Sequence, residues 1–295
     1  MRIADRPTEP EPHNPVMAKD KIAFIGGGVM GEAMIRAVLD RQVTPASHVA
    51  VTGPRTERRA ELAKQFGIAA VASNADAAKD ADVVVLSVKP QVLPAVMREL
   101  HGKLRAEQLV ISIVAGAPMK ALAAGLAHPA IVRSMPNTPA QVGMGVTAWY
   151  PSPAVTAAQR DRTKTILAAF GEELMVEDES YLDMATALSG TGPTYVFLLM
   201  EALVDAGVHL GFSRRVAEEL VLRTVEGSAL FARKSGRHLA ELRNMVTSPG
   251  GTSAAAIYQL EKGSLRTVLS KAVYAAYQRS SELGATAERK VTKSE

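Results

Sequence analysis

The sequence predicts an α/β protein with two domains, in which a doubly wound parallel sheet is followed by an all-α domain. Three observations predict this fold class. Short β-branched runs alternate with helical patterns from Lys21 to about Val176, as a parallel sheet with crossover helices requires. The first of these runs leads directly into a glycine-rich turn. From Tyr181 to Leu283 strand signals are absent, and Ala, Leu, Val, Glu and Arg recur with a helical period.

Strands are expected in the first domain wherever a short apolar run is bounded by polar or turn residues. The expected strands are Lys21–Ile25, His48–Thr52, Val83–Leu86, Leu109–Ile113, Ile131–Met135, Val146–Tyr150 and Glu173–Val176. Between them, apolar residues recur at three- and four-residue spacing, which predicts helices such as Gly28–Asp40, Glu57–Phe66 and Val92–Leu100.

The helices of the second domain have recognisable start signals. Gly192-Pro193 puts a proline at a first helical position, Ser213 can cap a helix that begins at Arg214, and Ser264 can cap the last helix. The helix from Pro193 is apolar on several faces, which indicates burial against neighbouring helices or a second subunit. We therefore expect a homodimer, which is compatible with a higher assembly such as a decamer.

Composition divides the 295 residues into three parts. Residues 1–18 are expected to be a disordered tail, because Met1–Pro15 holds four prolines among charged side chains and no apolar stretch of a secretory signal. Residues 19–178 are expected to form the nucleotide-binding domain. Residues 179–295 are expected to form the helical domain, which would bind the substrate and dimerise.

The composition also argues against several classes of function. The net charge is +4, but Lys and Arg are interspersed with Asp and Glu and only 4% of residues are aromatic, so a nucleic-acid partner is not expected. The strongest apolar run, Tyr195–Met200, is too short to span a bilayer. The chain has no cysteine, which fits a reducing compartment such as the cytoplasm. Its six histidines lack metal-ligand spacing, so no metal is expected.

The run Ile22–Gly31 reads as a buried strand that enters Gly-x-Gly-x-x-Gly and then a helix. Gly26 permits the tight turn, Gly28 lets a pyrophosphate approach the backbone, and Gly31 lets the helix pack close to the sheet. The phosphates would then lie on unpaired N–H groups at a helix N-terminus. This arrangement is typical of a Rossmann-type dinucleotide-binding domain. A glycine-rich turn without a ligand is the alternative.

The end of the second strand indicates which nucleotide is bound. An NAD-specific site usually has Asp or Glu there, which holds the ribose 2′-hydroxyl. This strand ends in Val51-Thr52-Gly53-Pro54-Arg55, with no carboxylate. A 2′-phosphate could accept hydrogen bonds from Thr52, Arg55 and Thr56, so NADPH is preferred and NADH remains possible. The alternative is that Arg55 and the neighbouring Arg58 and Arg59 form an ordinary solvated helix face.

Four further segments, with the glycine motif, resemble the pyrroline-5-carboxylate reductase family. They are Leu86-Ser-Val-Lys-Pro-Gln91, Arg133-Ser-Met-Pro-Asn-Thr-Pro-Ala140, Gly190-Thr-Gly-Pro-Thr-Tyr-Val-Phe197 and Val246-Thr-Ser-Pro-Gly-Gly-Thr-Ser253. The resemblance covers the chain except its two ends, and the last segment is the most specific. It implies an oxidoreductase of proline biosynthesis that reduces the C=N bond of 1-pyrroline-5-carboxylate to give L-proline with NAD(P)H.

The resemblance also implies a set of coenzyme-binding residues at the carboxyl ends of the strands. The adenosine end would meet Thr52, Arg55 and Asn74, and the nicotinamide half would lie near three segments further along the chain. The implied residues are Gly26, Gly28, Val29, Met30, Gly31, Thr52, Arg55, Asn74, Ser87, Val88, Lys89, Pro90, Val114, Ala115, Gly116 and Asn137. Lys89 is interpreted as a structural or phosphate-side cation and not as a catalytic group.

The loop before the helix Thr252–Glu261 is the expected substrate site. Backbone N–H groups are free at the start of a helix, so a small carboxylate could be held by Gly251, Thr252 and Ser253 together with the Ser248 hydroxyl. The family places its substrate on this loop, usually with Thr where this sequence has Ser253. Ser keeps the hydroxyl but loses the stiffness of a β-branched side chain. Ser253 is the expected catalytic residue. A helix cap with no ligand is the alternative.

Reduction of an imine needs little acid–base chemistry, because the ring nitrogen is readily protonated and positioning does most of the work. A 3-hydroxyacid dehydrogenase of similar build is the nearest rival, and it commonly needs a Lys in the helix that opens the second domain. From Thr165 to Arg233 this chain has no lysine. A non-enzymatic NADPH sensor, the other rival, would not need the Ser248–Ser253 loop.

Overall fold

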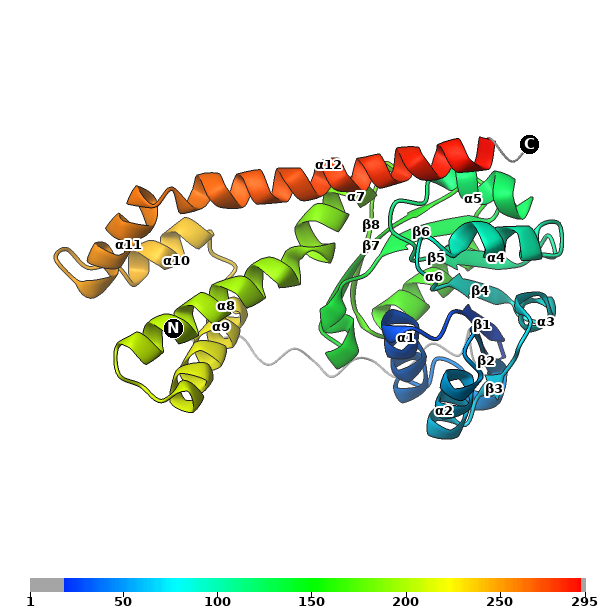
Figure 1. Ribbon diagram of the computed structural model, residues 1–295, viewed down its shortest axis with the longest axis horizontal. Helices are drawn as coiled ribbons and strands as arrows, with labels where there is room; N and C mark the ends of the chain where they lie inside the picture. The colour runs from blue at the N-terminus through cyan, green and yellow to red at the C-terminus, as the bar shows by residue number, and fades with distance from the viewer. Residues whose placement is uncertain (1–18, 293–295) are drawn as a thin grey trace. The chain divides into compact units, whose positions relative to one another are not determined.

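The structure is a computed structural model that describes residues 19–292, with side chains described for residues 19–284. The tail expected at residues 1–18 lies outside the described residues. The chain forms two compact units (Figure 1). The first contains the residues up to Gly190 and takes in the chain again from Tyr277, and the second is Thr191–Ala276. The composition change after Asp178 therefore precedes the division between the units, because the next turns of helix pack with the sheet.

The first unit is built on one eight-stranded sheet. Its strands run in the order β3-β2-β1-β4-β5-β6-β7-β8. All neighbouring pairs are parallel except β6 and β7, so β7 and β8 run against the other six. The strands are β1 Ile22–Ile25, β2 Val49–Thr52, β3 Ala69–Ala70, β4 Val83–Leu86, β5 Leu109–Ser112, β6 Ile131–Met135, β7 Gly145–Pro151 and β8 Gly171–Met175.

The seven expected strands are all present, with ends shifted by at most two residues. The two-residue strand β3 was not expected, because Ala69-Ala70 carries no β-branched signal. The central strands are buried on both faces, as the doubly wound prediction requires. In β1, Phe24 belongs to one hydrophobic cluster and Ile25 to the other, which follows from the alternation of side chains along a strand.

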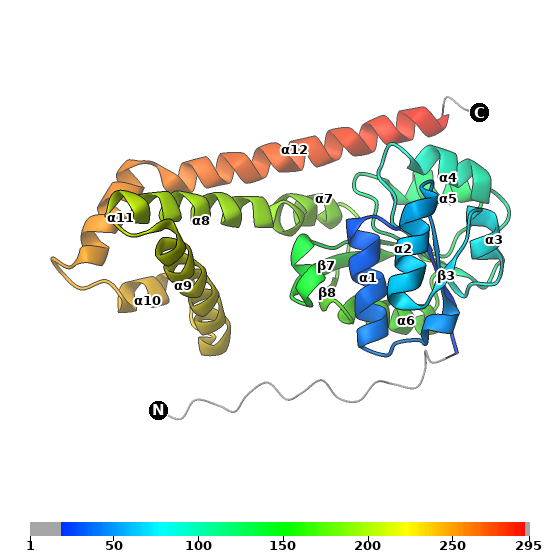
Figure 2. The ribbon, with the colours of Figure 1, turned by 60° about the horizontal axis from the view of Figure 1, so that its bottom comes forward.

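Helices cover both faces of this sheet. The cluster that contains Phe24 also includes residues of α1, α2 and α6, and the cluster that contains Ile25 includes residues of α3, α4 and α5. Figure 2 shows α1 and α2 side by side on the face turned toward the viewer. The helices of this unit are α1 Val29–Asp40, η2 Ala46–His48, α2 Thr56–Phe66, α3 Asn74–Lys79, α4 Leu93–Leu100, α5 Met119–Leu126, η3 Thr138–Val142, α6 Ala157–Ala168, α7 Tyr181–Ala185 and η4 Thr186–Gly190.

The second unit is all helix, as expected. Its helices are α8 Gly192–His209, α9 Arg214–Ser235, α10 Leu239–Met245, α11 Thr252–Lys262 and the first part of α12 Leu265–Thr292. Pro193 lies in the first turn of α8, and Ser213 is the N-cap residue of α9 but makes no side-chain cap hydrogen bond. Gly207 of α8 lies against Ala217 of α9, since a Cβ at Gly207 would come within 3.0 Å of the Ala217 Cβ.

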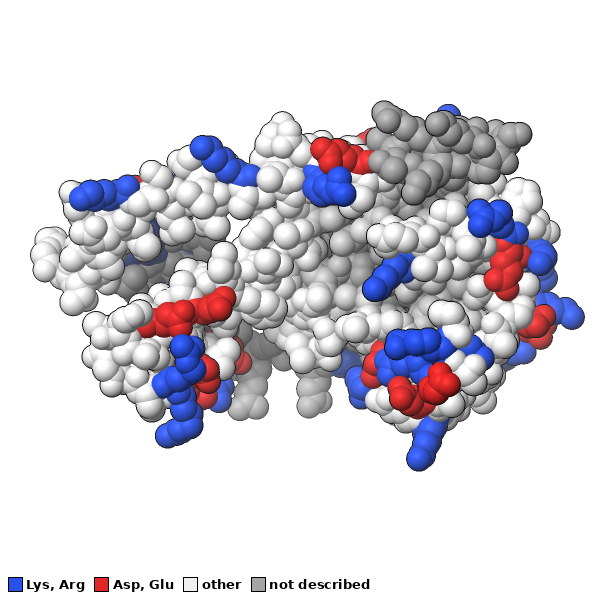
Figure 3. Space-filling view, in the orientation of Figure 1, with Lys and Arg blue, Asp and Glu red and all other residues white. Residues whose placement is uncertain are grey.

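Very little of the second unit is buried. Among residues 191–276 only Val204, Ala217 and Leu242 are buried, whereas Phe197 is 62% exposed and Leu210 83% exposed. A helical unit with so many exposed apolar side chains lacks a core of its own. On the face drawn in Figure 3, uncharged surface predominates and the acidic and basic side chains form small mixed groups.

Candidate functional site

The glycine loop after β1 is built by close contacts that only glycine allows. Gly26 has φ +114°, and a Cβ there would lie 2.6 Å from the Ser87 carbonyl oxygen. A Cβ at Gly31 would lie 2.3 Å from the Gly26 carbonyl oxygen, so Gly31 lets the first turn of α1 press onto the loop. By contrast, a Cβ at Gly28 would meet no atom within 4 Å. Gly28 therefore faces open space in which a ligand can approach the backbone.

That open space is part of a cavity of about 420 Å³. Gly28 is the N-cap of α1 and has no side chain to cap the helix, so the first N–H groups of Val29 and Met30 are available to an anion. The cavity is lined by Gly26, Gly27, Gly28, Thr52, Gly53, Pro54, Arg55, Arg58, Arg59, Leu62, Ser87, Val88, Lys89 and Val92. A dinucleotide coenzyme fits this donor set, because its pyrophosphate would meet backbone N–H groups and its adenosine end would meet arginines.

Thr52 and Asn74, both expected at the adenosine end, form a hydrogen bond with each other. The Thr52 hydroxyl donates to Asn74 Oδ1 at 2.6 Å, and Thr52 is only 1% exposed. Asn74 in turn donates from Nδ2 to Glu99 Oε2 at 2.7 Å and from its backbone N–H to Glu99 Oε1 at 2.8 Å. In this arrangement the only O–H of Thr52 is engaged by Asn74, and its donation to a 2′-phosphate stays a prediction.

The three arginines after β2 have different surroundings. Arg58 forms ion pairs with Glu32 and Glu61 and donates from Nε to the Gly27 carbonyl oxygen at 3.2 Å, and the hydrogen bond to Glu32 raises its pKa. Arg59 donates to the Gly53 carbonyl oxygen and to Thr56 Oγ1. Arg55 is exposed and lines the cavity, and its side chain makes no hydrogen bond or ion pair with any described residue. Arg55 is therefore the arginine best placed to meet a 2′-phosphate.

The segment after β4 supports the glycine loop from the side. The Ser87 hydroxyl donates to the Gly26 carbonyl oxygen at 2.8 Å, so it holds the loop, and Ser87 also lines the cavity. Val88 and Lys89 also line the cavity, and Lys89 is exposed. Pro90 lies in the turn that follows and is not part of the cavity wall. The interpretation of Lys89 as a cation beside the coenzyme stays a prediction.

The residues expected near the nicotinamide follow β5 and β6, at the same edge of the sheet. None of Val114, Ala115, Gly116 and Asn137 lines the cavity at the glycine loop. Val114 is buried, and Asn137 accepts a hydrogen bond at Oδ1 from the backbone N–H of Val146 at 2.9 Å. These residues lie outside the cavity at the glycine loop, so their contact with a coenzyme stays a prediction.

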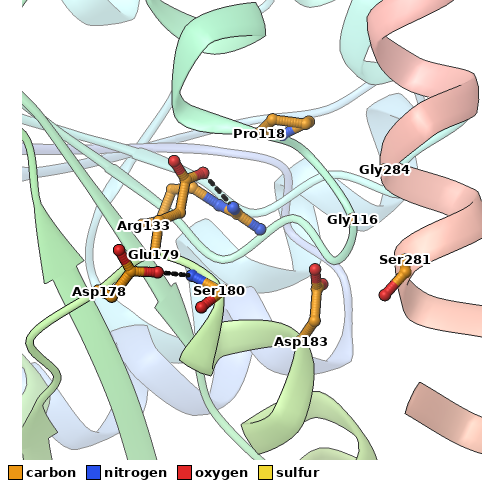
Figure 4. A pocket seen from close by; sticks show the side chains of 9 residues that line it. All are labelled: Gly116, Pro118, Arg133, Asp178, Glu179, Ser180, Asp183, Ser281 and Gly284. Carbon is orange, nitrogen blue, oxygen red and sulfur yellow. Dashed lines mark hydrogen bonds and ion pairs between the residues drawn. The ribbon is translucent and has the colours of Figure 1, made fainter. Parts of the chain in front are cut away.

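Gly116 belongs to a second cavity in the first unit, of about 500 Å³ (Figure 4). Arg133 of β6 is only 8% exposed and forms an ion pair there with Glu179. Glu179 also accepts a hydrogen bond from the Met119 backbone N–H at 2.6 Å, and hydrogen bonding to Ser180 lowers the pKa of Asp178. These carboxylates were not expected to line a cavity, since 46 residues separate Glu179 from Arg133 and no local pattern joins them.

Residues of α12 form part of the wall of this second cavity. Ser280 donates to Asp183 Oδ1 at 2.8 Å, and Ser281 and Gly284 line the wall. A Cβ at Gly116, which has φ +68°, would lie 3.0 Å from the Leu283 Cβ. The chain therefore returns to the sheet after the whole helical unit has been traversed. Among the described residues, no group of three or more His, Asp or Glu side chains could hold a metal ion.

The expected substrate loop lies in the second unit. Gly250 has φ +72°, and the Gly251 N–H donates to the Ser248 carbonyl oxygen at 3.0 Å, which forms a tight turn before α11. A Cβ at Gly251 would lie 2.5 Å from Ser248 Oγ, so the second glycine keeps this hydroxyl close to the helix start. Gly251 is the N-cap of α11 and has no capping side chain, which leaves the N–H groups of Thr252 and Ser253 for an anion.

Two protein-family models match the chain. Residues 21–116 match "NADP oxidoreductase coenzyme F420-dependent", and residues 179–283 match "Pyrroline-5-carboxylate reductase dimerisation". The first match covers the glycine loop and the residues that line the cavity beside it. The second begins where the composition changes and covers the loop before α11.

Similar proteins cover nearly the whole chain. A pyrroline-5-carboxylate reductase of Pseudomonas aeruginosa is 46% identical over 268 residues, which is 90% of this chain and 98% of that protein. The crystal structure of a pyrroline carboxylate reductase from Plasmodium falciparum with NADP bound has a TM-score of 0.84 at 32% identity, and covers 91% of this chain and 99% of the other.

A pyrroline-5-carboxylate reductase structure from Coxiella burnetii has a TM-score of 0.83 at 36% identity, and covers 90% of this chain and 98% of the other. Structures of other oxidoreductases, such as an archaeal ketol-acid reductoisomerase at 16% identity, share the fold alone. The similarity along both units, together with the glycine loop and the arrangement before α11, shows that the chain belongs to the pyrroline-5-carboxylate reductase family.

Proposed function

We propose that the protein reduces 1-pyrroline-5-carboxylate to L-proline with NADPH, the last step of proline biosynthesis. The observation that carries the proposal is the similarity to pyrroline-5-carboxylate reductases along nine-tenths of the chain, at up to 46% identity among the relatives compared. The cavity at the glycine loop and the uncapped start of α11 supply the two binding sites that such a reaction needs.

NADPH, when bound, supplies the hydride, and the chain's own residues bind and orient it. The N–H groups at the start of α1 would hold the pyrophosphate, and Gly28 leaves them accessible. Arg55 would pair with the 2′-phosphate. Because this pairing uses one exposed side chain, NADH remains a usable coenzyme at lower affinity.

The loop before α11 would hold the substrate carboxylate. The N–H groups of Thr252 and Ser253, with the Ser248 hydroxyl, are the proposed donors, and Gly251, whose own N–H bonds to the Ser248 carbonyl oxygen, forms the turn that presents them. The Ser253 hydroxyl would lie near the ring nitrogen and hold its proton in place. No strong general acid is needed, because the ring nitrogen is readily protonated before the substrate reaches the enzyme, and this makes the imine carbon electrophilic toward hydride.

The proposal includes a homodimer, which a higher assembly such as a decamer would contain. The family match to a dimerisation region supports this, as do the exposed apolar side chains of the helical unit. Within the described residues, Tyr181–His209 is long and apolar enough to span a membrane by length and composition, with a mean hydropathy of 1.2 and 17% of its best window buried. We assign this apolar surface to the second subunit of an enzyme in the cytoplasm, with no nucleic acid and no membrane as partner.

The proposal is tested by following NADPH absorbance at 340 nm with 1-pyrroline-5-carboxylate as substrate. The purified protein should oxidise NADPH only when the substrate is present. Ser253→Ala should lower kcat about tenfold without abolishing it, and Ser253→Thr, the usual family residue, should retain activity. Oxidation of a 3-hydroxyacid with NADP⁺ would favour the dehydrogenase rival. Tight NADPH binding with no turnover of either substrate would favour a sensor.

A further inference from the structure

Glu99, on α4, does not line the cavity at the glycine loop. Its carboxylate nevertheless accepts three hydrogen bonds from the start of α3. The donors are Asn74 Nδ2 at 2.7 Å, the Asn74 backbone N–H at 2.8 Å and the Ala75 backbone N–H at 3.4 Å. Asn74 is only partly exposed, and Thr52 lies on its other side. Glu99, Asn74 and Thr52 therefore form a hydrogen-bonded chain that ends at the cavity wall.

The direction of each hydrogen bond in this chain follows from Glu99. A carboxylate can only accept, so the Asn74 side chain must turn its nitrogen toward Glu99 and its oxygen toward Thr52. An amide oxygen also can only accept, so the Thr52 hydroxyl must donate its single hydrogen to Asn74 over the observed 2.6 Å. What Thr52 Oγ1 keeps for any other partner is acceptor capacity alone.

We infer that Glu99 is a positioning residue that sets the coenzyme preference at the end of β2. This inference rests on the proposed function. A family with an NAD-type site would place a carboxylate at the strand end, where it accepts a hydrogen bond from the ribose 2′-hydroxyl. Here Glu99 gives Thr52 the same acceptor character through Asn74. Thr52 therefore accepts from a 2′-hydroxyl and offers nothing to a 2′-phosphate, whose oxygens also accept.

The inference predicts the effect of changing the carboxylate to an amide. In Glu99→Gln the side-chain oxygen still accepts from the Asn74 backbone N–H, and the new NH₂ group faces the Asn74 side chain. Asn74 then turns its oxygen toward Gln and its nitrogen toward Thr52, which releases the Thr52 O–H toward the cavity. Affinity for a 2′-phosphate should rise about tenfold relative to a 2′-hydroxyl, the effect of one hydrogen bond to a charged group.

Titration calorimetry measures this directly on the full chain with adenosine 2′,5′-bisphosphate and adenosine 5′-monophosphate as probes. The ratio of their affinities should rise about tenfold in Glu99→Gln, and the ratio of kcat/KM for NADPH and NADH should rise equally, with little change in kcat. If the protein bound both probes but lacked pyrroline reduction, the proposed function would fail while calorimetry still tested Glu99.

Thr52→Val provides the matched control, because it keeps the shape and removes the hydroxyl. Alone, this substitution should lower the affinity for adenosine 5′-monophosphate several-fold and leave the affinity for the bisphosphate nearly unchanged. This result can be measured even if Glu99→Gln does not fold. In the Thr52→Val background, Glu99→Gln should no longer alter the ratio. If Glu99 only caps α3, Glu99→Gln should lower the affinities for both probes equally, with Thr52 present or replaced by Val. That result would overturn the inference.

Discussion

The unit built on the sheet buries its large apolar side chains, whereas the helical unit leaves most of its own exposed. In the first, Trp149 and Phe170 are fully buried between the sheet and its helices. In the second, Phe197 and Tyr258 remain mostly exposed, and three of residues 191–276 are buried. The first unit thus has a core of its own, which holds the glycine loop in shape. The second unit lacks such a core among its described residues, which fits the proposed dimer, so we expect the proposed substrate loop to depend on assembly.

The largest expected effect comes from placing a charge on that apolar surface. Phe197→Asp should convert the dimer to a monomer in sedimentation velocity and lower pyrroline-dependent activity roughly a hundredfold, because an interface cannot bury an unpaired carboxylate. NADPH binding by the first unit should survive. The control is Glu219→Ala, an exposed change on α9, which should leave the dimer intact. A fully active monomeric Phe197→Asp protein would contradict the comparison.

Substitutions in the glycine loop test the converse, in which the first unit loses coenzyme affinity and the helical unit is unaffected. Gly28→Ala adds a Cβ that meets no protein atom within 4 Å, so Tm and the dimer should be unchanged while NADPH affinity falls about tenfold or more. In Gly31→Ala the added Cβ collides with the Gly26 carbonyl oxygen, so both Tm and affinity should fall. Calorimetry and thermal unfolding distinguish the two. Unchanged NADPH affinity in Gly28→Ala would show that the pyrophosphate does not bind at this loop.

Arg55→Ala is expected to have a smaller and more selective effect. KM for NADPH should rise about tenfold, the loss of one charge-assisted hydrogen bond, and KM for NADH should hardly change. Arg59 provides the control, because it is engaged with the Gly53 carbonyl and Thr56 and its removal should not discriminate between the coenzymes. Equal changes for NADPH and NADH in Arg55→Ala would mean that Arg55 is only a surface residue.

The smallest expected effect concerns the buried edge of the first unit. Burial raises the pKa of Asp20 more than its ion pair with Arg162 lowers it, so the charged carboxylate destabilises the folded state at neutral pH. Because the pKa of Asp20 is higher in the folded state than its ordinary value of 3.8, folding is not destabilised well below pH 3.8, where the carboxyl is protonated in both states. The destabilisation develops as the pH rises above 3.8 and is complete once the pH has passed the folded-state pKa. Asp20→Asn should therefore raise Tm by about 2 °C at pH 7 and by less near pH 4. A lower Tm at pH 7 would show that the Arg162 pair dominates.

The strands and the glycine loop could be predicted because their signals are local. A strand buried on both faces is a continuous apolar run, and the loop glycines lie within six residues of one another. The Asn74–Glu99 contact could not be predicted, since 25 residues separate the two and neither belongs to a motif that requires the other. The hydrogen bond of Thr52 to Asn74 also joins residues that are distant in the sequence, so the sequence could not show that the Thr52 hydroxyl already has an acceptor.

The boundary between the units also depends on contacts that the local sequence does not show. Composition marks the place after Asp178 where strands stop, but compactness depends on which side chains pack together. Leu182 and Ala187 are buried with the sheet, so the division follows Gly190. The roles of Ser248, Gly251, Thr252 and Ser253 stay predictions, because the structure describes their loop within the helical unit alone.

The return of α12 to the sheet has a consequence for how the protein is made. Ser280 reaches the ribosome exit 97 residues after its hydrogen-bond partner Asp183, and Leu283 packs on Gly116 later still. The nucleotide-binding unit is therefore discontinuous in the chain and cannot be completed during synthesis until the helical unit has emerged. A nascent chain stalled before Tyr277 would carry all eight strands but lack the part of the second cavity's wall that Ser281 and Gly284 form.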